Sequence, residues 1–366
     1  MKWSDILTII SGKNQKGVAS EDGEYFIYGS GGIIGRANDY LCPANTVIVG
    51  RKGTINHPLY VTEPFWNIDT AFGVVAGEEL LPKFLYYFCL QFNFKELDKS
   101  TGRPSVSKAD LLKIEMPIPN IEEQARIVSR IEELFSELDK GVETLQVIKE
   151  QLAVYRQAVL KMVFASMNER KSIQEVSSLV TSGSRGWAKY YNEKGVRFIR
   201  ITDLTRDKIK LKNNAIQRVL LPEGVEGKRS RLQGNDVLIS ITADLGSIAL
   251  VPEDVEEAYI NQHIAVVRFV NSHQGEFMAW YLKSDYGQKE LLRNKRGGGK
   301  LGLGLDDIRN TLVPIVSDEV ADEVVSEIES RMSVCDSIEQ TVDTALSQAE
   351  AMRQSILKKA FEGGLN

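Results

Sequence analysis

The sequence of 366 residues predicts an α+β fold. We expect two mixed α/β domains in pseudo-two-fold arrangement, joined by a pair of long antiparallel coiled-coil helices. The first observation behind this prediction is an internal repeat, since residues 101–164 recur without a gap as residues 298–361. The second is the helical period of the apolar residues in two segments, each of about 45 residues. The third is a set of short β-branched runs, typical of strands, before each helix.

These observations divide the chain into four segments. Residues 1–119 and 169–316 are the two expected domains, and residues 120–168 and 317–366 are the two expected helices. The whole chain has a net charge of −5, but the second domain alone carries +5 and the second helix −7. Because binding of a polyanion follows the local field, the overall acidity does not exclude a nucleic-acid partner.

Within the domains, the sequence predicts both strands and short helices. The strand at 46–49 in the first domain has a counterpart at 236–239 in the second, where the shift is 190 residues. A further expected strand covers 263–269, and short helices are expected around 83–94 and 275–292. Basic residues at every second position from Arg206 to Lys212 predict the exposed face of an edge strand, where lysine prevents aggregation.

Each long helix has start or stop signals. Asn120 is a good N-cap for the first helix, with Glu123 as the partner of a capping box. Gly363-Gly364 is a stop signal for the second. Apolar residues follow three- and four-residue steps and predict a narrow seam on each helix. The first seam is Ile127, Ile131, Leu134, Leu138, Val142, Leu145, Ile148, Leu152, Tyr155, Val159 and Met162, and the second is Val324, Ile328, Cys335, Ile338, Val342, Ala345, Ala349, Met352 and Ile356.

A helix with one apolar stripe needs a partner, and we expect the two helices to cover each other. The link between the first helix and the second domain, residues 165–172, spans at most about 27 Å. A parallel pair would require the chain to return along the whole helix, whereas an antiparallel pair does not. The sequence therefore predicts antiparallel pairing.

Composition excludes several kinds of protein. No stretch is long and apolar enough to cross a membrane, and the N-terminus has none of the features of a signal peptide. The scattered cysteines and histidines show no ligand spacing, so we expect buried thiols in a reducing, cytoplasmic compartment and no metal site. These residues are Cys42, Cys89, Cys335, His57, His263 and His273.

No catalytic motif is present in the sequence. The segment 297–300 resembles a phosphate-binding loop, but Leu301 stands where a P-loop has Ser or Thr. There is no Asn/Asp-Pro-Pro-aromatic tetrapeptide and no glycine-rich cofactor loop after a strand. The paired acids at 256–257 and 306–307 are more typical of a solvated turn or helix start than of a catalytic site.

Glycine-rich and basic loops in the first domain are the candidates for DNA contact. Glycine allows backbone amides to approach a phosphate, and arginine can bind guanine with two hydrogen bonds. A surface turn or a solvated charge is the alternative for each of them. The candidate residues are Tyr28, Ser30, Gly31, Arg36, Arg51, Lys52, Thr101 and Arg103.

The second domain has two similar loops. Basic and aromatic residues alternate in the first, which suits contact with both phosphate and base, although Trp187 is equally well explained as a core residue. The second loop is the strongest basic cluster and occupies the repeat position of Thr101 to Arg103. The candidate residues are Ser184, Arg185, Trp187, Lys189, Arg293, Lys295, Arg296 and Lys300.

The complete arrangement resembles the specificity subunits of Type I restriction–modification systems, over essentially the whole chain. The similarity is carried by the loops at 28–36 and 182–191, by the strand at 236–240 and above all by the helix pair. In the helices the similar segments are 122–128, 155–161 and 353–361. The second helix departs from the pattern, because it opens with Asp318-Glu319-Val320-Ala321 in place of Glu-Glu-Gln.

The resemblance implies two target-recognition domains, each of which reads one half of a bipartite site in double-stranded DNA. It implies that the helices set the gap and dock two modification subunits, and it leaves open whether restriction subunits join. This chain would bind no cofactor and would not be an enzyme, since the partners use S-adenosylmethionine for adenine methylation and ATP with magnesium for restriction. The expected docking residues are Arg156, Gln157, Lys161, Arg353, Gln354 and Lys358.

Two alternatives remain open from the sequence. A coiled-coil scaffold that binds proteins or glycans would show no sequence-selective protection of DNA, with or without partners. A self-contained DNA methyltransferase or nuclease would need a cofactor loop or metal-binding carboxylates, and methyl transfer by the purified chain alone would support it.

Overall fold

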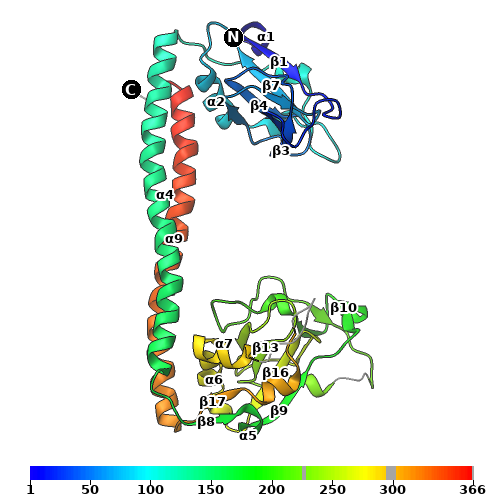
Figure 1. The fold of residues 1–366 in the computed structure, drawn as a ribbon, viewed down its shortest axis with the longest axis vertical. Helices are drawn as coiled ribbons and strands as arrows, with labels where there is room; N and C mark the ends of the chain where they lie inside the picture. Colours follow the sequence, from blue (N-terminus) through cyan, green and yellow to red (C-terminus); the bar gives the residue numbers. More distant parts are fainter. Residues whose placement is uncertain (225–227, 294–301, 365–366) are drawn as a thin grey trace. The chain divides into compact units, whose positions relative to one another are not determined.

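A computed structural model describes residues 1–366 except 225–227, 294–301 and 365–366. The chain divides into two compact units. The first unit is Met1–Gln146 with Asp343–Asn366, and the second is Val147–Val342. Each unit therefore holds one mixed α/β domain together with parts of both long helices (Figure 1).

The first domain is built on two small sheets. One has the strand order β1-β7-β4-β5 and is antiparallel throughout, and the other has the order β3-β2-β6 with β2 and β6 parallel. The elements are α1 (Trp3–Ile6), β1 (Leu7–Ser11), β2 (Tyr25–Gly29), β3 (Gly32–Ala37), β4 (Thr46–Gly50), β5 (Leu59–Val61), β6 (Phe65–Asn67), β7 (Ala71–Ala76), α2 (Pro82–Gln91) and α3 (Lys108–Leu111).

The second domain repeats these two sheets, with the orders β14-β13-β16-β9 and β10-β12-β11-β15, and adds the pair β17-β8. The strands are β8 (Arg170–Ser172), β9 (Ser177–Ser182), β10 (Tyr191–Asn192), β11 (Val196–Ile199), β12 (Arg218–Val219), β13 (Val237–Ser240), β14 (Ile248–Leu250), β15 (Ala258–Ile260), β16 (Ile264–Phe269) and β17 (Leu312–Pro314). The short helices are α5 (Ile173–Val176), α6 (Gly275–Lys283), α7 (Asp285–Leu292) and α8 (Leu305–Arg309).

Residues that occupy the same place in the two sheet systems are called equivalent below. Asn45 and Asn235, which precede β4 and β13, both adopt a left-handed backbone, with φ of 58° and 65°. Asparagine tolerates this conformation better than most residues. The predicted match between these two strands is therefore confirmed, and the predicted strands at 236–240 and 263–269 correspond to β13 and β16.

The long helices are α4 (Ile121–Phe164) and α9 (Asp318–Phe361), and they run antiparallel. In the first unit, the start of α4 and the end of α9 share one core, and in the second unit the end of α4 and the start of α9 share another. The Asn120 side chain accepts a hydrogen bond of 2.8 Å from the Glu123 amide, which confirms the N-cap. Gly363 has φ of 81°, and the Gly364 amide donates to the carbonyl oxygen of Lys359 at 2.8 Å, which confirms the stop signal.

Some of the predicted seam residues are wrong. Tyr155 and Met162 of α4 and Ile338 and Met352 of α9 are exposed. The chosen steps follow a 3.5-residue repeat, whereas a straight helix has 3.6 residues per turn, so the buried stripe drifts away from a strict seam. In their place Leu160 and Phe164, among others, are buried at the end of α4.

The helical segment expected at 275–292 is confirmed as two helices, α6 and α7, which are separated at Ser284. The backbone of Ser284 is extended, and its hydroxyl caps α7 by accepting from the Gly287 amide at 3.2 Å. The segment from Arg206 to Lys212 is a loop, not an edge strand. Lys283 holds this loop by donating to the carbonyl oxygen of Lys208 at 2.8 Å and to that of Thr205, just before the loop, at 3.1 Å. Burial lowers the pKa of Lys283 to about 8.

Candidate nucleic-acid interface

Three loops predicted to contact DNA come together at one edge of the first domain. The Ser30 hydroxyl donates a hydrogen bond of 2.9 Å to the carbonyl oxygen of Lys52. The Gly53 amide donates to the carbonyl oxygen of Pro104 at 2.8 Å, and Lys52 pairs with Ser105 in an isolated β-bridge. The loops around Ser30, Lys52 and residues 101–103 therefore form one contiguous surface, which we call the first-domain edge.

The exposed charges of this edge are Lys52 and Arg103. Gly53 has φ of 84°, and a side chain built on it would press against the Arg103 guanidinium, so glycine allows the two loops to approach. Gly31 and Thr101 are exposed on the same loops. The edge thus presents two cations, a small hydroxyl and an accessible backbone.

Beside the edge lies a cavity of about 320 Å³ whose lining includes basic and hydroxyl side chains. Basic side chains and serine hydroxyls both donate hydrogen bonds to phosphate oxygens. The polar and charged residues that line the cavity are Arg51, Lys52, Lys108, Ser11, Ser105 and Ser107. Sequence reasoning missed Lys108, because no glycine or second basic residue stands next to it.

The structure gives Tyr28 and Arg36 internal contacts. Tyr28 packs edge-on against Phe65 with ring centroids 5.2 Å apart, and burial raises its pKa. The Arg36 guanidinium lies 4.4 Å from the ring centroid of Phe26 and donates to the carbonyl oxygen of Gly23 at 3.0 Å. For Tyr28 and Arg36, these contacts favour a structural turn over contact with DNA.

In the second domain, the predicted loop divides into exposed and buried residues. Arg185 and Lys189 are exposed, and Ser184 is joined to Asn261 by a β-bridge. Trp187 is only 3% exposed, and it stacks on Phe198 with ring centroids 5.7 Å apart. This burial agrees with the core alternative and removes Trp187 from the candidate contact residues.

The basic loop at 293–300 lies mostly outside the described residues. Arg293 is exposed and lies 3.6 Å from Glu290, while nothing is described for Lys295, Arg296 and Lys300. Gly302, which follows these residues in the sequence, pairs with Thr242 in an isolated β-bridge. This bridge is equivalent to that between Lys52 and Ser105 in the first domain.

Two groups of exposed or half-buried polar residues were missed by the sequence reasoning. The first group is residues 13–16, which follow Gly12 and are equivalent to the segment that starts at Ser184, after Gly183. The two glycines are equivalent, because the amide of each donates at 3.2 Å to an equivalent carbonyl oxygen of the neighbouring strand. The repeated Ser-Gly dipeptides at 11–12 and 182–183 were the available signal. The second group is Thr242, Gln262 and His263, which no sequence pattern marks.

The structure corrects the role of two expected docking residues. Arg156 is buried and binds Asp336 at 2.5 Å and Glu339 at 2.8 Å across the helix pair. Arg353 forms an ion pair with Asp139, which is the same contact with the helices exchanged. Both arginines therefore contribute to the pairing of α4 with α9, and Arg156 is buried in it. The remaining docking candidates are half-buried or exposed: Gln157, Lys161, Gln354 and Lys358.

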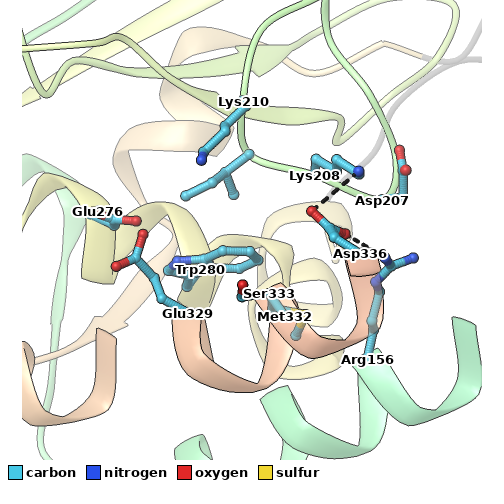
Figure 2. Close-up of a pocket in the computed structure, with 11 residues that line it drawn as sticks. Arg156, Asp207, Lys208, Lys210, Glu276, Trp280, Glu329, Met332, Ser333 and Asp336 are labelled. Carbon is cyan, nitrogen blue, oxygen red and sulfur yellow. Dashed lines mark hydrogen bonds and ion pairs between the residues drawn. The ribbon is translucent and has the colours of Figure 1, made fainter. Parts of the chain in front are cut away.

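A cavity of about 350 Å³ lies where the second domain meets α9. Figure 2 shows the carboxyl groups of Glu276 and Glu329 directed toward each other beside Trp280. Burial, followed by the neighbouring Glu329, raises the pKa of Glu276. Lys208 binds Asp336 at 3.3 Å, and no candidate DNA-contact residue lines this cavity. It is a contact between domain and helix, distinct from the predicted interface.

Several predicted absences can be compared with the described part of the chain. In it, no group of three or more His, Cys, Asp or Glu residues could hold a metal ion. No helix there is long and apolar enough to cross a membrane. The three cysteines are buried free thiols, as predicted, and burial raises the pKa of Cys42 to about 12.

Comparison with known proteins identifies relatives of the chain. A family model described as "Type I restriction modification DNA specificity domain" matches residues 1–150 and 170–348. The chain is 24% identical over 352 residues to the Type I restriction enzyme EcoBI specificity subunit of Escherichia coli, with 87% of this chain and 73% of that protein covered. It is 25% identical over 288 residues to the MjaVIII specificity subunit of Methanocaldococcus jannaschii, with 71% and 64% covered.

Solved structures share the fold. A chain from a study of complex assembly and conformational transition of the type I R-M system superposes with a TM-score of 0.76 at 17% identity, and the match covers 100% of this chain and 97% of that one. The HsdS subunit from Thermoanaerobacter tengcongensis gives a TM-score of 0.52 at 17% identity, with 100% and 96% covered. Because the family model matches most of the chain and both repeats, the chain belongs to the Type I restriction modification DNA specificity family.

Proposed function

We propose that this chain is the subunit that selects the DNA sequence in a Type I restriction–modification complex. Each domain reads one half of a bipartite site in double-stranded DNA. The observation that carries the proposal is that two equivalent domain edges have the same backbone contacts but different side chains: Lys52 faces Ser105 in one, and Thr242 faces Gly302 in the other. Because side chains read base edges while the backbone sets their position, the two half-sites should differ in sequence.

The two long helices connect the domains and set the gap between the half-sites. A pseudo-two-fold pair of readers at fixed spacing is the geometry with which symmetric DNA-binding dimers read two half-sites. Each domain alone should bind weakly, and the linkage raises the affinity through the effective concentration of the second reader.

The catalytic steps belong to partner subunits in this proposal. Two modification subunits dock on the exposed helix faces and methylate adenine with S-adenosylmethionine, and restriction subunits, where present, use ATP and magnesium. The support for docking is the presence of large apolar side chains that no element of the described chain covers, such as Val154 at 70% and Val334 at 59% exposure. Such exposed apolar residues suit a protein partner better than DNA.

Mapping of methylated sites tests the proposal. The genome of a host that carries the neighbouring modification subunit is mapped with and without this chain. We expect a bipartite, asymmetric adenine-methylation motif that disappears when the chain is removed. Unchanged methylation, with the modification subunit shown to be present and active, would exclude the proposal and favour a scaffold.

A further inference from the structure

Neutral polar side chains gather at the edge of the second domain that is equivalent to the basic first-domain edge. The Arg51 amide donates to the carbonyl oxygen of Thr70 at 2.8 Å, and the equivalent Ile241 amide donates to that of His263 at 2.9 Å. The backbone is therefore the same in both places. Where the first domain has Arg51 and Lys52, the second has Ile241 and Thr242, with Gln262 and His263 alongside.

The three polar side chains of this second-domain edge form one hydrogen-bonded chain. Thr242 Oγ1 lies 2.7 Å from His263 Nδ1, and Gln262 Nε2 lies 2.9 Å from His263 Nε2. An amide nitrogen can only donate a hydrogen bond, so Nε2 of His263 is the acceptor. The ring proton is then on Nδ1, which donates to the Thr242 hydroxyl. The imidazole thus holds the amide of Gln262 and the hydroxyl of Thr242 at the same time.

This arrangement leaves the Gln262 amide with a defined pair of groups. One N–H is used by His263, and the carbonyl oxygen and the second N–H remain for a ligand. Adenine presents an N6 donor beside an N7 acceptor in the major groove, and an amide with one acceptor and one donor matches both. Gln262 is half-buried, which limits the conformations that the amide can adopt.

The local charge favours a base over a phosphate as this ligand. Asp244 follows Thr242 by two residues, and it is bound by Arg206 and by the Ser247 hydroxyl, the latter at 2.7 Å. The acid and the arginine balance each other, so this pair adds no net positive charge beside Thr242. A phosphate would gain little from the pair, whereas the neutral face of a base meets no opposing charge from it.

We propose that Gln262 reads an adenine in the half-site of the second domain and that His263 is the residue that positions its amide. This rests on the proposed function, because it requires DNA on the second-domain edge. It assigns the base at one position of one half-site, which neither the family nor the sequence specifies.

The test maps methylation motifs in a host that carries the modification subunit and one variant of the full chain. The variants are Gln262→Ala, Gln262→Glu, His263→Phe and His263→Gln. The matched control is Asp69→Ala, since Asp69 precedes Thr70 as Gln262 precedes His263. Wild type must give a bipartite motif, and its absence counts against the proposed function and not against this inference.

We expect Gln262→Ala to relax one adenine position of one half-site, with discrimination there reduced at least about 10-fold. The other half-site and the gap should be unchanged. Gln262→Glu should shift the preference at that position toward cytosine, whose N4 group donates to a carboxylate. Asp69→Ala should leave this half-site intact.

His263→Phe should relax the same position, because the residue remains aromatic but loses the acceptor for the amide. His263→Gln retains an acceptor and a donor, so this variant should keep the preference for adenine at that position. An unaltered motif for Gln262→Ala would overturn the proposal. Loss of all methylation by a Gln262→Ala chain that unfolds at the wild-type temperature would also overturn it, since removal of one base reader should relax the site and not abolish it. Relaxation by Gln262→Ala but not by His263→Phe would exclude the positioning role.

Discussion

The contact between domain and helix is made by an ion pair in the first unit and by an acid pair in the second. Lys83 of α2 binds Glu132 of α4 at 2.5 Å. The equivalent residues in the second unit are Glu276 of α6 and Glu329 of α9, which face each other beside Trp280 (Figure 2). The repeat has therefore retained the backbone arrangement while the chemistry of the contact has changed.

A second difference in chemistry is seen about two turns earlier, at the start of each long helix. Gln124 of α4 is fully buried, and its amide oxygen accepts from the Leu81 amide at 2.8 Å while its nitrogen donates to the carbonyl oxygens of Glu79 and Pro119. Its equivalent in α9 is Ala321, which cannot make these bonds.

In the second unit, Gln274, a residue of the domain and not of the long helix, makes the corresponding hydrogen bond to the start of the helix. Its side chain donates to the carbonyl oxygen of Val316, the residue equivalent to Pro119, at 3.2 Å. The two helix starts thus make related but not identical contacts, as the altered opening sequence of α9 indicated. An equivalent backbone position can be satisfied by a side chain from either partner.

Aromatic packing should show the largest difference between the units. Phe164 is 1% exposed and packs on two aromatic rings of α6, whereas its equivalent Phe361 is only partly buried against two rings of α2. We expect Phe164→Ala to lower the free energy of unfolding of its unit by about 3–5 kcal/mol. Phe361→Ala should cost less because fewer contacts are lost. Urea unfolding monitored by hydrogen exchange in each unit measures both values, and equal losses would contradict the comparison.

Removal of the glutamine side chains should have an intermediate effect. Gln124→Ala leaves a buried amide and two carbonyl oxygens without partners, which should cost about 1–3 kcal/mol. Gln274→Ala affects a half-buried side chain and should cost about 1 kcal/mol. The thermal unfolding of the two single variants and of the double variant gives these values. Additive losses are expected, since each glutamine lies in its own unit, and a strong coupling between them would be unexpected.

The acid pair should give the smallest effect, visible as a pH dependence. Burial and the facing Glu329 raise the pKa of Glu276 above 4.5, so the folded unit holds this proton more tightly than the unfolded chain. The resulting stabilisation is complete below pH 4.5 and is lost as the pH rises through the raised pKa. Lys210, the cation that faces the pair, reduces this effect. We expect wild type to lose stability relative to Glu276→Gln across this window.

A matched set of charge variants sharpens the test. Glu276→Lys recreates the ion pair of the first unit and should stabilise the second by about 0.2–1 kcal/mol at neutral pH. Lys83→Glu creates an acid pair with Glu132 and should give the first unit the same sign of pH dependence. Melting temperatures between pH 4 and 8 measure both. An identical pH profile for wild type and Glu276→Gln would show that the pair does not share a proton.

Local signals in the sequence were sufficient for much of the fold. The cap at Asn120, the stop at Gly363 and the matched asparagines before β4 and β13 act over a few residues, so they can be recognised without knowledge of the partner. Antiparallel pairing followed from the short length of the link at residues 165–172. The loop from Arg206 to Lys212 was misassigned because its charges find partners on distant elements, such as Asp336, which no local pattern reveals.

The candidate interface was predictable only where glycine and basic residues occur together. Ser30, Lys52 and Arg103 were each selected for the same chemistry, but that their loops meet at one edge was not predicted from the sequence. Arg156 was misassigned, because a buried ion pair between helices and an exposed docking residue have the same sequence signature. Gln262 and His263 were missed, because their significance comes from a hydrogen-bonded chain with Thr242, which is 21 residues before His263 in the sequence.

Gly12 and Gly183 have a practical consequence for engineering. A side chain on either glycine would collide with a backbone carbonyl oxygen, that of Ile68 in one domain and that of Ile260 in the other. The loop that follows each glycine is therefore attached at a point that tolerates no other residue, whatever the rest of the loop contains. Such fixed attachment points permit a loop to be transplanted between the two domains without altering the sheet, and exchange of residues 13–15 with 184–186 would be a small graft of this kind that leaves the buried Trp187 in place.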